Sequence, residues 1–265
     1  MKKIIKILYK IIPFKLEIFS ILKLIWTPPF NIYQHLHFIG NFRVKIDRLK
    51  SFKIRHYGYQ IENKIFWGGL TNGFEKESIK LWMKLCPNAK VIMDIGANTG
   101  IYSLIAKSIN PEAKVYAFEP VSRIFKKLKE NISLNSLNIF PVEKAISNSD
   151  GFATIFDEGT DHIYSVTVNK NLSAPHIKVT ETKINTISLN TFIKDHNIAK
   201  VDLMKIDVET HEPEVLQGFS KYLSKHRPTM LIEILNDEVG KEVNKLVLGL
   251  GYLYFNIDED GGIRQ

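Results

Sequence analysis

The sequence contains very little cysteine, and this indicates the redox compartment in which the protein works. Cys86 is the single cysteine among 265 residues, which excludes an internal disulfide. No histidine or second cysteine lies near it in the sequence, so we expect a buried thiol without a chemical role. A chain without a disulfide framework is typical of a reducing compartment, and we therefore expect a cytoplasmic protein.

The sequence also lacks a long apolar run free of charge. Residues 1–26 read MKKIIKILYKIIPFKLEIFSILKLIW, in which lysines recur too often for a spanning helix of about 20 mostly apolar residues. They also interrupt the short apolar core that a signal peptide requires. Lys3, Lys6 and Lys10 share one helix face, and Pro13 separates this helix from a second apolar stretch.

Two interpretations of residues 1–30 remain open. Basic amphipathic helices of this kind lie on anionic membranes, which predicts peripheral contact with the inner membrane face through residues 1–26. The same pattern is typical of helices that pack on the main domain or on a second subunit, with their lysines in solvent. The sequence does not predict an oligomeric state.

Acidic residues are scarce in the first part of the chain. Residues 1–60 contain twelve Lys or Arg against two acids, a net charge of +10, whereas the remainder contains 24 basic and 26 acidic residues. A nucleic-acid-binding enzyme would need a basic stripe around its site, and the basic surplus lies elsewhere. The Pro-Pro-aromatic segment at residues 27–30 also lacks the Asn or Asp that would accept an exocyclic amine. We expect no nucleic-acid partner.

Residues 31–85 form an accessory segment with strand periodicity. Apolar and charged residues alternate over residues 42–47 and again over 52–56, which predicts a β-hairpin. A helix is expected at about residues 73–85. Aromatic residues near the turn glycines between them are expected in a local core.

The third segment, residues 86–265, begins with the most informative stretch, Val91–Gly100. Its apolar run predicts a buried parallel strand that leads into a tight turn at Gly96. Gly100 is expected in the first turn of the next helix, where a missing side chain lets helix and strand approach. Asp94 stands where a dinucleotide-binding turn has its first glycine, which favours a ligand with a positive charge over a pyrophosphate.

Two acids follow later strands of the predicted sheet. Glu119 ends a strand over residues 113–118, about 20 residues past the glycine turn, where a carboxylate holds ribose hydroxyls. Glu143 follows a short strand at residues 139–142 and is the expected polar contact of an adenine ring.

A second group of ionisable residues crowds the end of a strand at Val201–Val208. Four ionisable residues lie within six positions there: Asp207, Glu209, His211 and Glu212. Glu233 lies in a fifth strand at residues 229–235. Ligands bind outside the carboxyl ends of parallel strands, and crowded acids and histidines shift each other's pKa values. The residues that we expect to be catalytic are Asp207, Glu209, His211 and Glu233. No tight ligand spacing stands out, so we expect no metal ion.

The rest of this segment gives coarser expectations. Strands are predicted at residues 153–156 and 178–182, and the loop at 160–175 between them is expected to fold over the site. His162 and His176 lie in this region and are expected to be surface residues. A sixth strand is predicted at residues 252–257, followed by a short final strand from residue 263.

Together these pieces resemble the FkbM-type family of S-adenosylmethionine-dependent methyltransferases. The matching stretches are DIGANTG (94–100), VYAFEP (115–120), KAISNSDG (144–151), MKIDVETHE (204–212) and LIEI (231–234). The resemblance implies an α/β fold of the class I methyltransferase (Rossmann-like) type, with a seven-stranded, mostly parallel sheet and helices on both faces. Thr210 stands where the family usually has glycine, so we expect the backbone there to avoid a left-handed conformation.

The resemblance also implies which residues bind the cofactor and which ones act on the methyl acceptor. S-adenosyl-L-methionine is the expected cofactor, held by Asp94, Gly96, Ala97, Asn98, Gly100, Glu119, Glu143 and Asp207. Asp207, Glu209, His211 and Glu233 are expected to orient the acceptor, with His211 or Glu209 as the base. The acceptor would be a hydroxyl of a sugar, a glycan, a glycolipid or a secondary metabolite.

Two other functions are compatible with the sequence. An NAD-dependent oxidoreductase could use the same fold, although Asp94 in place of a first glycine counts against it. A non-catalytic module could bind an anionic membrane or a partner through residues 1–30, with a degenerate cofactor site.

Overall fold

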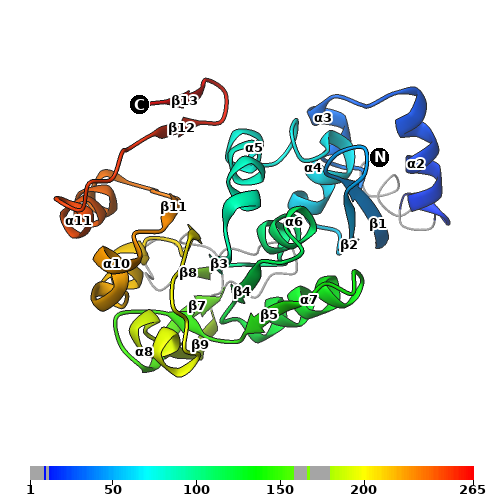
Figure 1. Cartoon of the computed structure of the whole chain (residues 1–265). Coiled ribbons are helices and arrows are strands. Elements are labelled where there is room, and N and C mark those ends of the chain that lie inside the picture. The colour runs from blue at the N-terminus through cyan, green and yellow to red at the C-terminus, as the bar shows by residue number, and fades with distance from the viewer. Residues whose placement is uncertain (1–8, 10–11, 158–165, 168–179) are drawn as a thin grey trace.

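The centre of the protein is a parallel β-sheet of five strands (Figure 1). The computed structural model describes residues 9, 12–157, 166–167 and 180–265. The strands are β3 (Val91–Ile95), β4 (Lys114–Phe118), β5 (Ile139–Val142), β10 (Leu203–Ile206) and β11 (Thr229–Ile232). Their spatial order is β11-β10-β3-β4-β5, so the order reverses between β3 and β10. This topological switch is where open α/β sheets bind ligands.

Helices cover both faces of the sheet, as expected for buried parallel strands. Successive residues of β3 point to opposite sides: Ile92 joins one hydrophobic cluster, and Met93 joins the other. The helices that follow the strands are α6 (Ile101–Ile109), α7 (Ser122–Ser133), α8 (Leu189–Asp195), α9 (Glu212–Gln217), α10 (Ser220–His226) and α11 (Asp237–Val247). The predicted α/β class is confirmed.

The accessory segment packs into the same core as the central sheet. It comprises α2 (Lys15–Ile25), α3 (Phe30–Tyr33), β1 (Gly40–Lys45), β2 (Ser51–His56), α4 (Gln60–Gly68), α5 (Lys76–Leu85) and the 3₁₀ helix η1 (Cys86–Asn88). The predicted hairpin is confirmed, with Phe42 opposite Ile54. Helix α4 was not predicted; its Phe66 and Trp67 share a hydrophobic cluster with Ile92 of β3. Cys86 is buried, as expected.

A second, smaller sheet lies beside the first. Its strands are β6 (Ala145–Ile146), β7 (Gly151–Asp157), β8 (Val166–Thr167) and β9 (Thr180–Ile187), in the order β6-β9-β7-β8. The strand predicted at residues 153–156 lies within β7, and the one at 178–182 overlaps the start of β9. Most of the expected loop at 160–175, with His162 and His176, lies outside the described residues.

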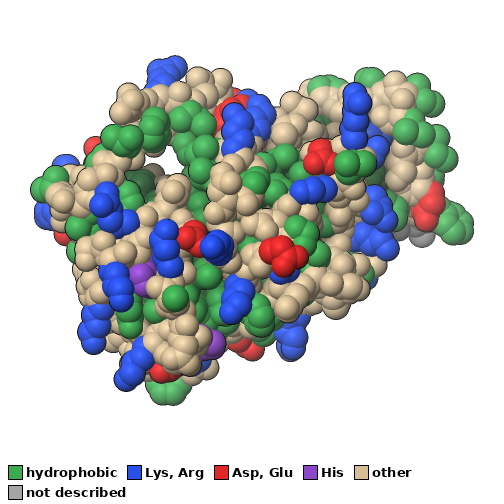
Figure 2. Space-filling model, viewed as in Figure 1, with side chains coloured by type: hydrophobic (Ala, Val, Ile, Leu, Met, Phe, Trp, Pro, Cys, Tyr) green, Lys and Arg blue, Asp and Glu red, His purple; other side chains and the backbone are tan. Residues whose placement is uncertain are grey.

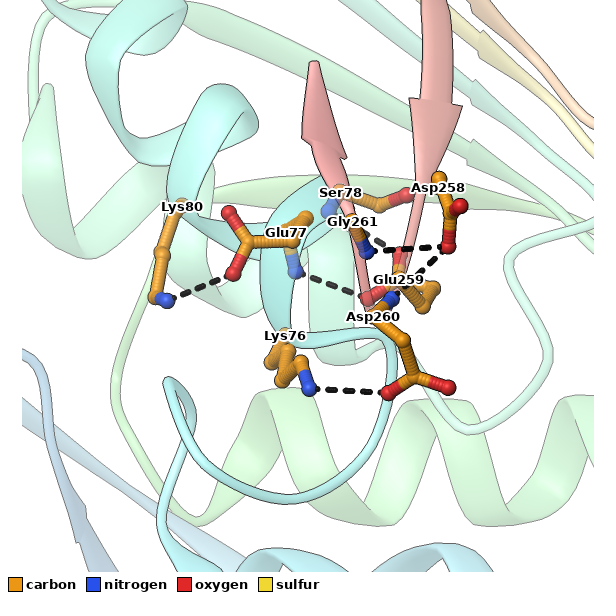
Figure 3. A network of polar contacts seen from close by, with 8 residues as sticks. All are labelled: Lys76, Glu77, Ser78, Lys80, Asp258, Glu259, Asp260 and Gly261. Carbon is orange, nitrogen blue, oxygen red and sulfur yellow. Dashed lines mark hydrogen bonds and ion pairs between the residues drawn. The ribbon is translucent and has the colours of Figure 1, made fainter.

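The C-terminal strands depart from the expected seven-stranded sheet. The strand predicted at residues 252–257 begins only at Asn256, and β12 (Asn256–Asp258) pairs with β13 (Gly262–Arg264) in a separate hairpin. Its tip reaches the N-terminus of α5 (Figure 3). The Glu259 carboxylate accepts the backbone N–H groups of Glu77 at 2.7 Å and Ser78 at 3.1 Å. This carboxylate satisfies helix donors that have no partner within the helix, and this holds the hairpin against α5.

Candidate active site

A cavity of about 410 Å³ lies at the carboxyl ends of the central strands. Many residues predicted for the site line it together: Gly96, Ala97, Asn98, Glu119, Asp207, Glu209, His211 and Glu233. The accessory segment completes its wall through Tyr59, Gln60, Ile61, Phe74 and Glu75. The other predicted positions, Asp94, Gly100 and Glu143, are not among the lining residues.

The two strand ends at the topological switch touch each other at Gly96. This glycine has a φ of 79°, and a Cβ built on it would lie 1.8 Å from the carbonyl oxygen of Asp207. Only glycine allows the turn after β3 to meet the end of β10 so closely. The sequence predicted the tight turn but not this contact between the two halves of the site.

The missing side chain of Gly100 leaves room for a different neighbour from the expected one. It precedes α6 as its N-cap, with a φ of 93°, and an added Cβ would lie 2.6 Å from Cδ1 of Leu128 in α7. We expected the missing side chain to let α6 approach the strand before it. That expectation is wrong, because the space is instead occupied by Leu128 of α7.

Asp94 is fully buried beneath the cavity. Its Oδ2 accepts the Ser103 hydroxyl at 2.6 Å, whereas its Oδ1 has no hydrogen-bond partner among the described residues. Burial raises the pKa of Asp94, an effect that the positive charge of Lys205 opposes. An unpaired carboxylate oxygen at this depth is costly, which favours a polar ligand or water against it.

Glu119 lies at the end of β4 in a position to receive hydroxyl groups. Its two oxygens accept backbone N–H groups, from Asn98 at 3.1 Å and from Val121 at 2.9 Å. Each carboxylate oxygen has a second lone pair, so both can still accept a hydroxyl from the cavity. Burial raises the pKa of Glu119 to about 7, and these two backbone bonds limit the rise.

The side chain of Glu143 does not line the cavity. It is exposed and accepts a hydrogen bond from the Ser122 hydroxyl. The neighbouring part of the cavity wall is mostly apolar, and Tyr59, Val121, Ile155 and Ile184 form one hydrophobic cluster there. A flat aromatic ring fits such a surface without a carboxylate.

Lys205 was expected only as a partner for the carboxylate of Glu233, and the sequence did not predict it as a central residue of the site. Strand register places it beside Asp94, and it is only 6% exposed. Its Nζ lies 2.6 Å from Oδ2 of Asp207 and 4.5 Å from the ring centroid of Tyr102. Burial alone would lower the pKa of Lys205, but the charges of Asp207, Glu75 and Asp94 raise it. The sequence did contain a signal for this residue, because a lysine inside an otherwise apolar strand must find a buried partner or a ligand.

Asp207 and Glu233 form a hydrogen-bonded carboxyl pair next to this lysine. Desolvation at the cavity wall and the negative charge of Asp207 raise the pKa of Glu233 to about 8, although the residue as a whole is exposed at the cavity rim. Burial would raise the pKa of Asp207 too, but Lys205 and the bond from Glu233 hold it below its usual range. At neutral pH the pair therefore carries one proton, on Glu233.

Glu75 brings a further carboxylate from the accessory segment. It precedes α5 with a φ of 41°, and the Tyr102 hydroxyl donates to its Oε2 at 2.5 Å. Burial raises the pKa of Glu75, and Lys205 opposes this rise. No local pattern marks Glu75 as a site residue, because it reaches the cavity only through tertiary packing.

The loop after β10 adopts the conformation that its threonine was expected to avoid. Glu209 and Thr210 have φ values of 55° and 78°, so both lie in the left-handed region. The expectation drawn from Thr210 is therefore wrong. The buried carboxylate of Glu212 accepts the Val208 N–H at 3.1 Å and closes the loop from below, which helps to stabilise the strained backbone.

His211 lines the cavity, and both of its ring nitrogens have partners. Its Nε2 is 3.0 Å from the Ser147 hydroxyl, and its Nδ1 is 3.4 Å from Oε2 of Glu214. Burial lowers the pKa of His211, whereas the charge of Glu214 opposes that shift. The ring is therefore mostly neutral at pH 7.

Within the described residues, no group of three or more His, Cys, Asp or Glu is arranged to hold a metal ion. The carboxylates of Asp94, Asp207 and Glu75 are instead close enough to Lys205 for its charge to act on all three.

The parallel sheet, the glycine turn and the carboxylate after β4 are typical of α/β enzymes that bind a nucleoside cofactor at the topological switch. The model of the Methyltransferase FkbM domain matches residues 94–254, and the chain belongs to this family. Members of the family use S-adenosylmethionine, and the chain is accordingly an S-adenosylmethionine-dependent methyltransferase.

Three curated relatives are similar to this chain over part of its length. A hexuronic acid methyltransferase of Haloferax volcanii is 28% identical over 70% of this chain and 74% of its own length. A 31-O-demethyl-FK506 methyltransferase of Streptomyces tacrolimicus is 26% identical over 48% of this chain and 58% of its own length. A 2-O-methyltransferase of Sinorhizobium fredii is 25% identical over 52% of this chain and 60% of its own length. None of these comparisons supports an oxidoreductase or a non-catalytic module.

The residues around the cavity fit the cofactor. Two of the buried polar atoms that have no hydrogen-bond partner within the described part of the chain lie in or beside the glycine turn, where the amino-acid end would bind: Oδ1 of Asp94 and Oδ1 of Asn98. Glu119 has free lone pairs for ribose hydroxyls, and the apolar cluster around Tyr59 and Val121 suits the adenine ring.

Proposed function

We propose that the chain methylates a hydroxyl oxygen of a sugar, either within a glycan or on a small molecule. The observation that carries this proposal is the carboxyl pair of Asp207 and Glu233, which shares one cavity with the cofactor residues. Carboxylates are strong acceptors for hydroxyl hydrogens, and this end of the cavity offers several of them.

The cofactor residues position the reaction. Asp94, Gly96, Ala97, Asn98 and Gly100 form and support the turn that holds the amino-acid end, and Glu119 holds the ribose. S-adenosylmethionine supplies a methyl group that its sulfonium already activates. The protein then has to align the acceptor oxygen with that methyl group and remove one proton.

The carboxyl pair is the proposed route for this proton. Asp207, kept ionised by Lys205 at 2.6 Å, accepts a hydrogen bond from the acceptor hydroxyl. The proton of that hydroxyl passes to the pair and ends on Glu233, which, once deprotonated, is the stronger base because its pKa is about 8. His211 is a weaker candidate, because both ring nitrogens already have partners. Glu209 borders the cavity and helps to orient the acceptor.

The charge of the cavity favours a neutral sugar. Glu75, Asp207 and Glu209 line it as carboxylates beside the protonated Glu233, against the two lysines of the lining, Lys144 and Lys205. The relative from Haloferax volcanii is named for an anionic sugar, hexuronic acid, so the two proteins are proposed to differ in acceptor charge.

The test is to incubate the protein with S-adenosylmethionine carrying a ¹³C-methyl group and with paired neutral and hexuronic sugars. The proposal expects a ¹³C resonance of an O-methyl ether, stronger with the neutral member of each pair. A methyl ester or an N-methyl product would contradict the proposed chemistry. A stronger signal from the hexuronic sugar would contradict the acceptor class alone.

A further inference from the structure

Helix α2 has its amphipathic faces in an unusual orientation. Its outward side carries Phe14 just before the helix, then Ile18, Ile21, Leu24 and Ile25, which are 74%, 46%, 61%, 86% and 84% exposed. A surface helix normally turns its apolar side inward and its charged side to water.

The inward side of α2 makes specific contacts with the rest of the accessory segment. Phe19 is buried against Phe38 and Trp67, and Lys23 reaches inward to donate to the carbonyl oxygen of Phe66 in α4. The orientation of the helix is therefore fixed by specific contacts, and the apolar residues face outward as a consequence.

The apolar surface continues beyond the helix. Trp26, Phe30 and Ile32 follow α2 and are each between 41% and 49% exposed. We call these three residues and the five of α2 the α2 face. Green side chains gather along the edge of the molecule where α2 lies, with blue side chains near them (Figure 2). Contiguous exposed apolar patches of this kind mark sites of interaction.

The charge around the α2 face indicates the kind of partner. Residues 12–60, which contain it, carry eight Lys or Arg, of which Lys23 reaches inward, and two acids, whereas residues 61–265 carry 24 basic and 26 acidic residues. An apolar face within a basic segment matches a bilayer with anionic headgroups, because apolar residues enter the headgroup region and cations stay near the phosphates. Tryptophan, as at Trp26, is enriched at that depth.

We propose that the α2 face is a docking surface for an anionic lipid bilayer. The chain would lie on the membrane through this face, since no helix in the described part of the chain is long and apolar enough to cross one. Helix α4 links the docked surface to the cavity: its Phe66 accepts the bond from Lys23, and its first residues Gln60 and Ile61 line the cavity wall. This proposal does not depend on the identity of the methyl acceptor.

The first test is co-sedimentation of the full chain with vesicles of phosphatidylcholine alone or mixed equally with phosphatidylglycerol. Binding is expected to the mixed vesicles and to weaken at high salt, which screens surface charge. The double variant Ile21→Glu, Ile25→Glu should lose at least tenfold in binding. The control Leu248→Glu, Leu253→Glu changes residues that are 71% and 73% exposed elsewhere, and it should bind like the unchanged chain.

A second measurement does not depend on variants. Trp67 and Trp82 are buried and Trp26 is exposed, so lipids brominated on their acyl chains should quench the emission of Trp26 alone. No quenching, or equal vesicle binding by the chain and its double variant, would overturn the proposal. So would a dimer in light scattering that the double variant converts to a monomer without vesicle binding, because the α2 face would then be covered by a second copy.

Discussion

Lys205 is the single residue on which the site's electrostatics depend most. It is the positive charge next to the buried Asp94, the half-buried Glu75 and Asp207 of the carboxyl pair. Removing one partner from a buried ionic group leaves uncompensated charge, which costs more than the intact group contributes.

The substitution Lys205→Met tests this role, because it keeps the length of the side chain and removes the charge. We expect a loss of about 3–5 kcal/mol in the free energy of unfolding, measured by urea denaturation. The matched control is Lys200→Met, whose exposed side chain pairs with Asp202 at 3.2 Å and should cost less than about 1 kcal/mol. Equal losses in the two variants would contradict the assignment.

Glu233 should give the reaction a distinctive pH dependence. Its pKa of about 8 means that it is protonated at neutral pH and becomes a base only as the pH rises through that value. We therefore expect kcat/KM to rise across pH 7–9, and Glu233→Gln to abolish this limb. If His211 were the base instead, its lowered pKa would leave the profile flat above pH 7.

At the scale of single elements, the loop after β10 stores strain. A left-handed conformation costs a β-branched residue about 1–2 kcal/mol, and part of this is recovered if glycine replaces it. Thr210→Gly should therefore stabilise the fold by up to about 1 kcal/mol in denaturant titrations. As the control, Lys221→Gly within α10 should destabilise it by about 1 kcal/mol. A loss of stability from Thr210→Gly would show that its side chain has a contact worth more than the strain.

The C-terminal hairpin depends on one carboxylate. Glu259 accepts two N–H groups at the N-terminus of α5 (Figure 3). The residue before that helix is Glu75 of the site. Glu259→Ala should cost about 1 kcal/mol of stability and speed proteolysis after residue 250. Glu242→Ala, which breaks an exposed pair with Lys245, should leave both unchanged. Equal proteolysis of the two variants would contradict a restraining role for Glu259.

At the scale of the whole molecule, local patterns predicted the sheet and much of the cavity. The run around Ile92 and Met93 identified a buried parallel strand, and the spacing from Gly96 to Glu119 placed both at the cavity. These features repeat over a few residues or at a fixed distance along the chain, so they are visible without a structure.

The rest depended on packing between distant segments. Glu75 reaches the cavity because the accessory segment packs on the central sheet, and Lys205 meets Asp94 through strand register. Glu143 has a suitable sequence position, yet its side chain turns to Ser122. The C-terminal strands pair with each other, which strand periodicity alone cannot distinguish from joining the sheet.

Calorimetry with S-adenosylhomocysteine most directly tests the claim that one cavity at the switch between β3 and β10 receives the cofactor. Two glutamates follow neighbouring strands, but only Glu119 lines the cavity. We predict that Glu119→Gln weakens binding at least tenfold while Glu143→Gln binds like the unchanged protein, with both variants folded by circular dichroism. Wild-type affinity in Glu119→Gln together with lost affinity in Glu143→Gln would contradict the assignment of the site.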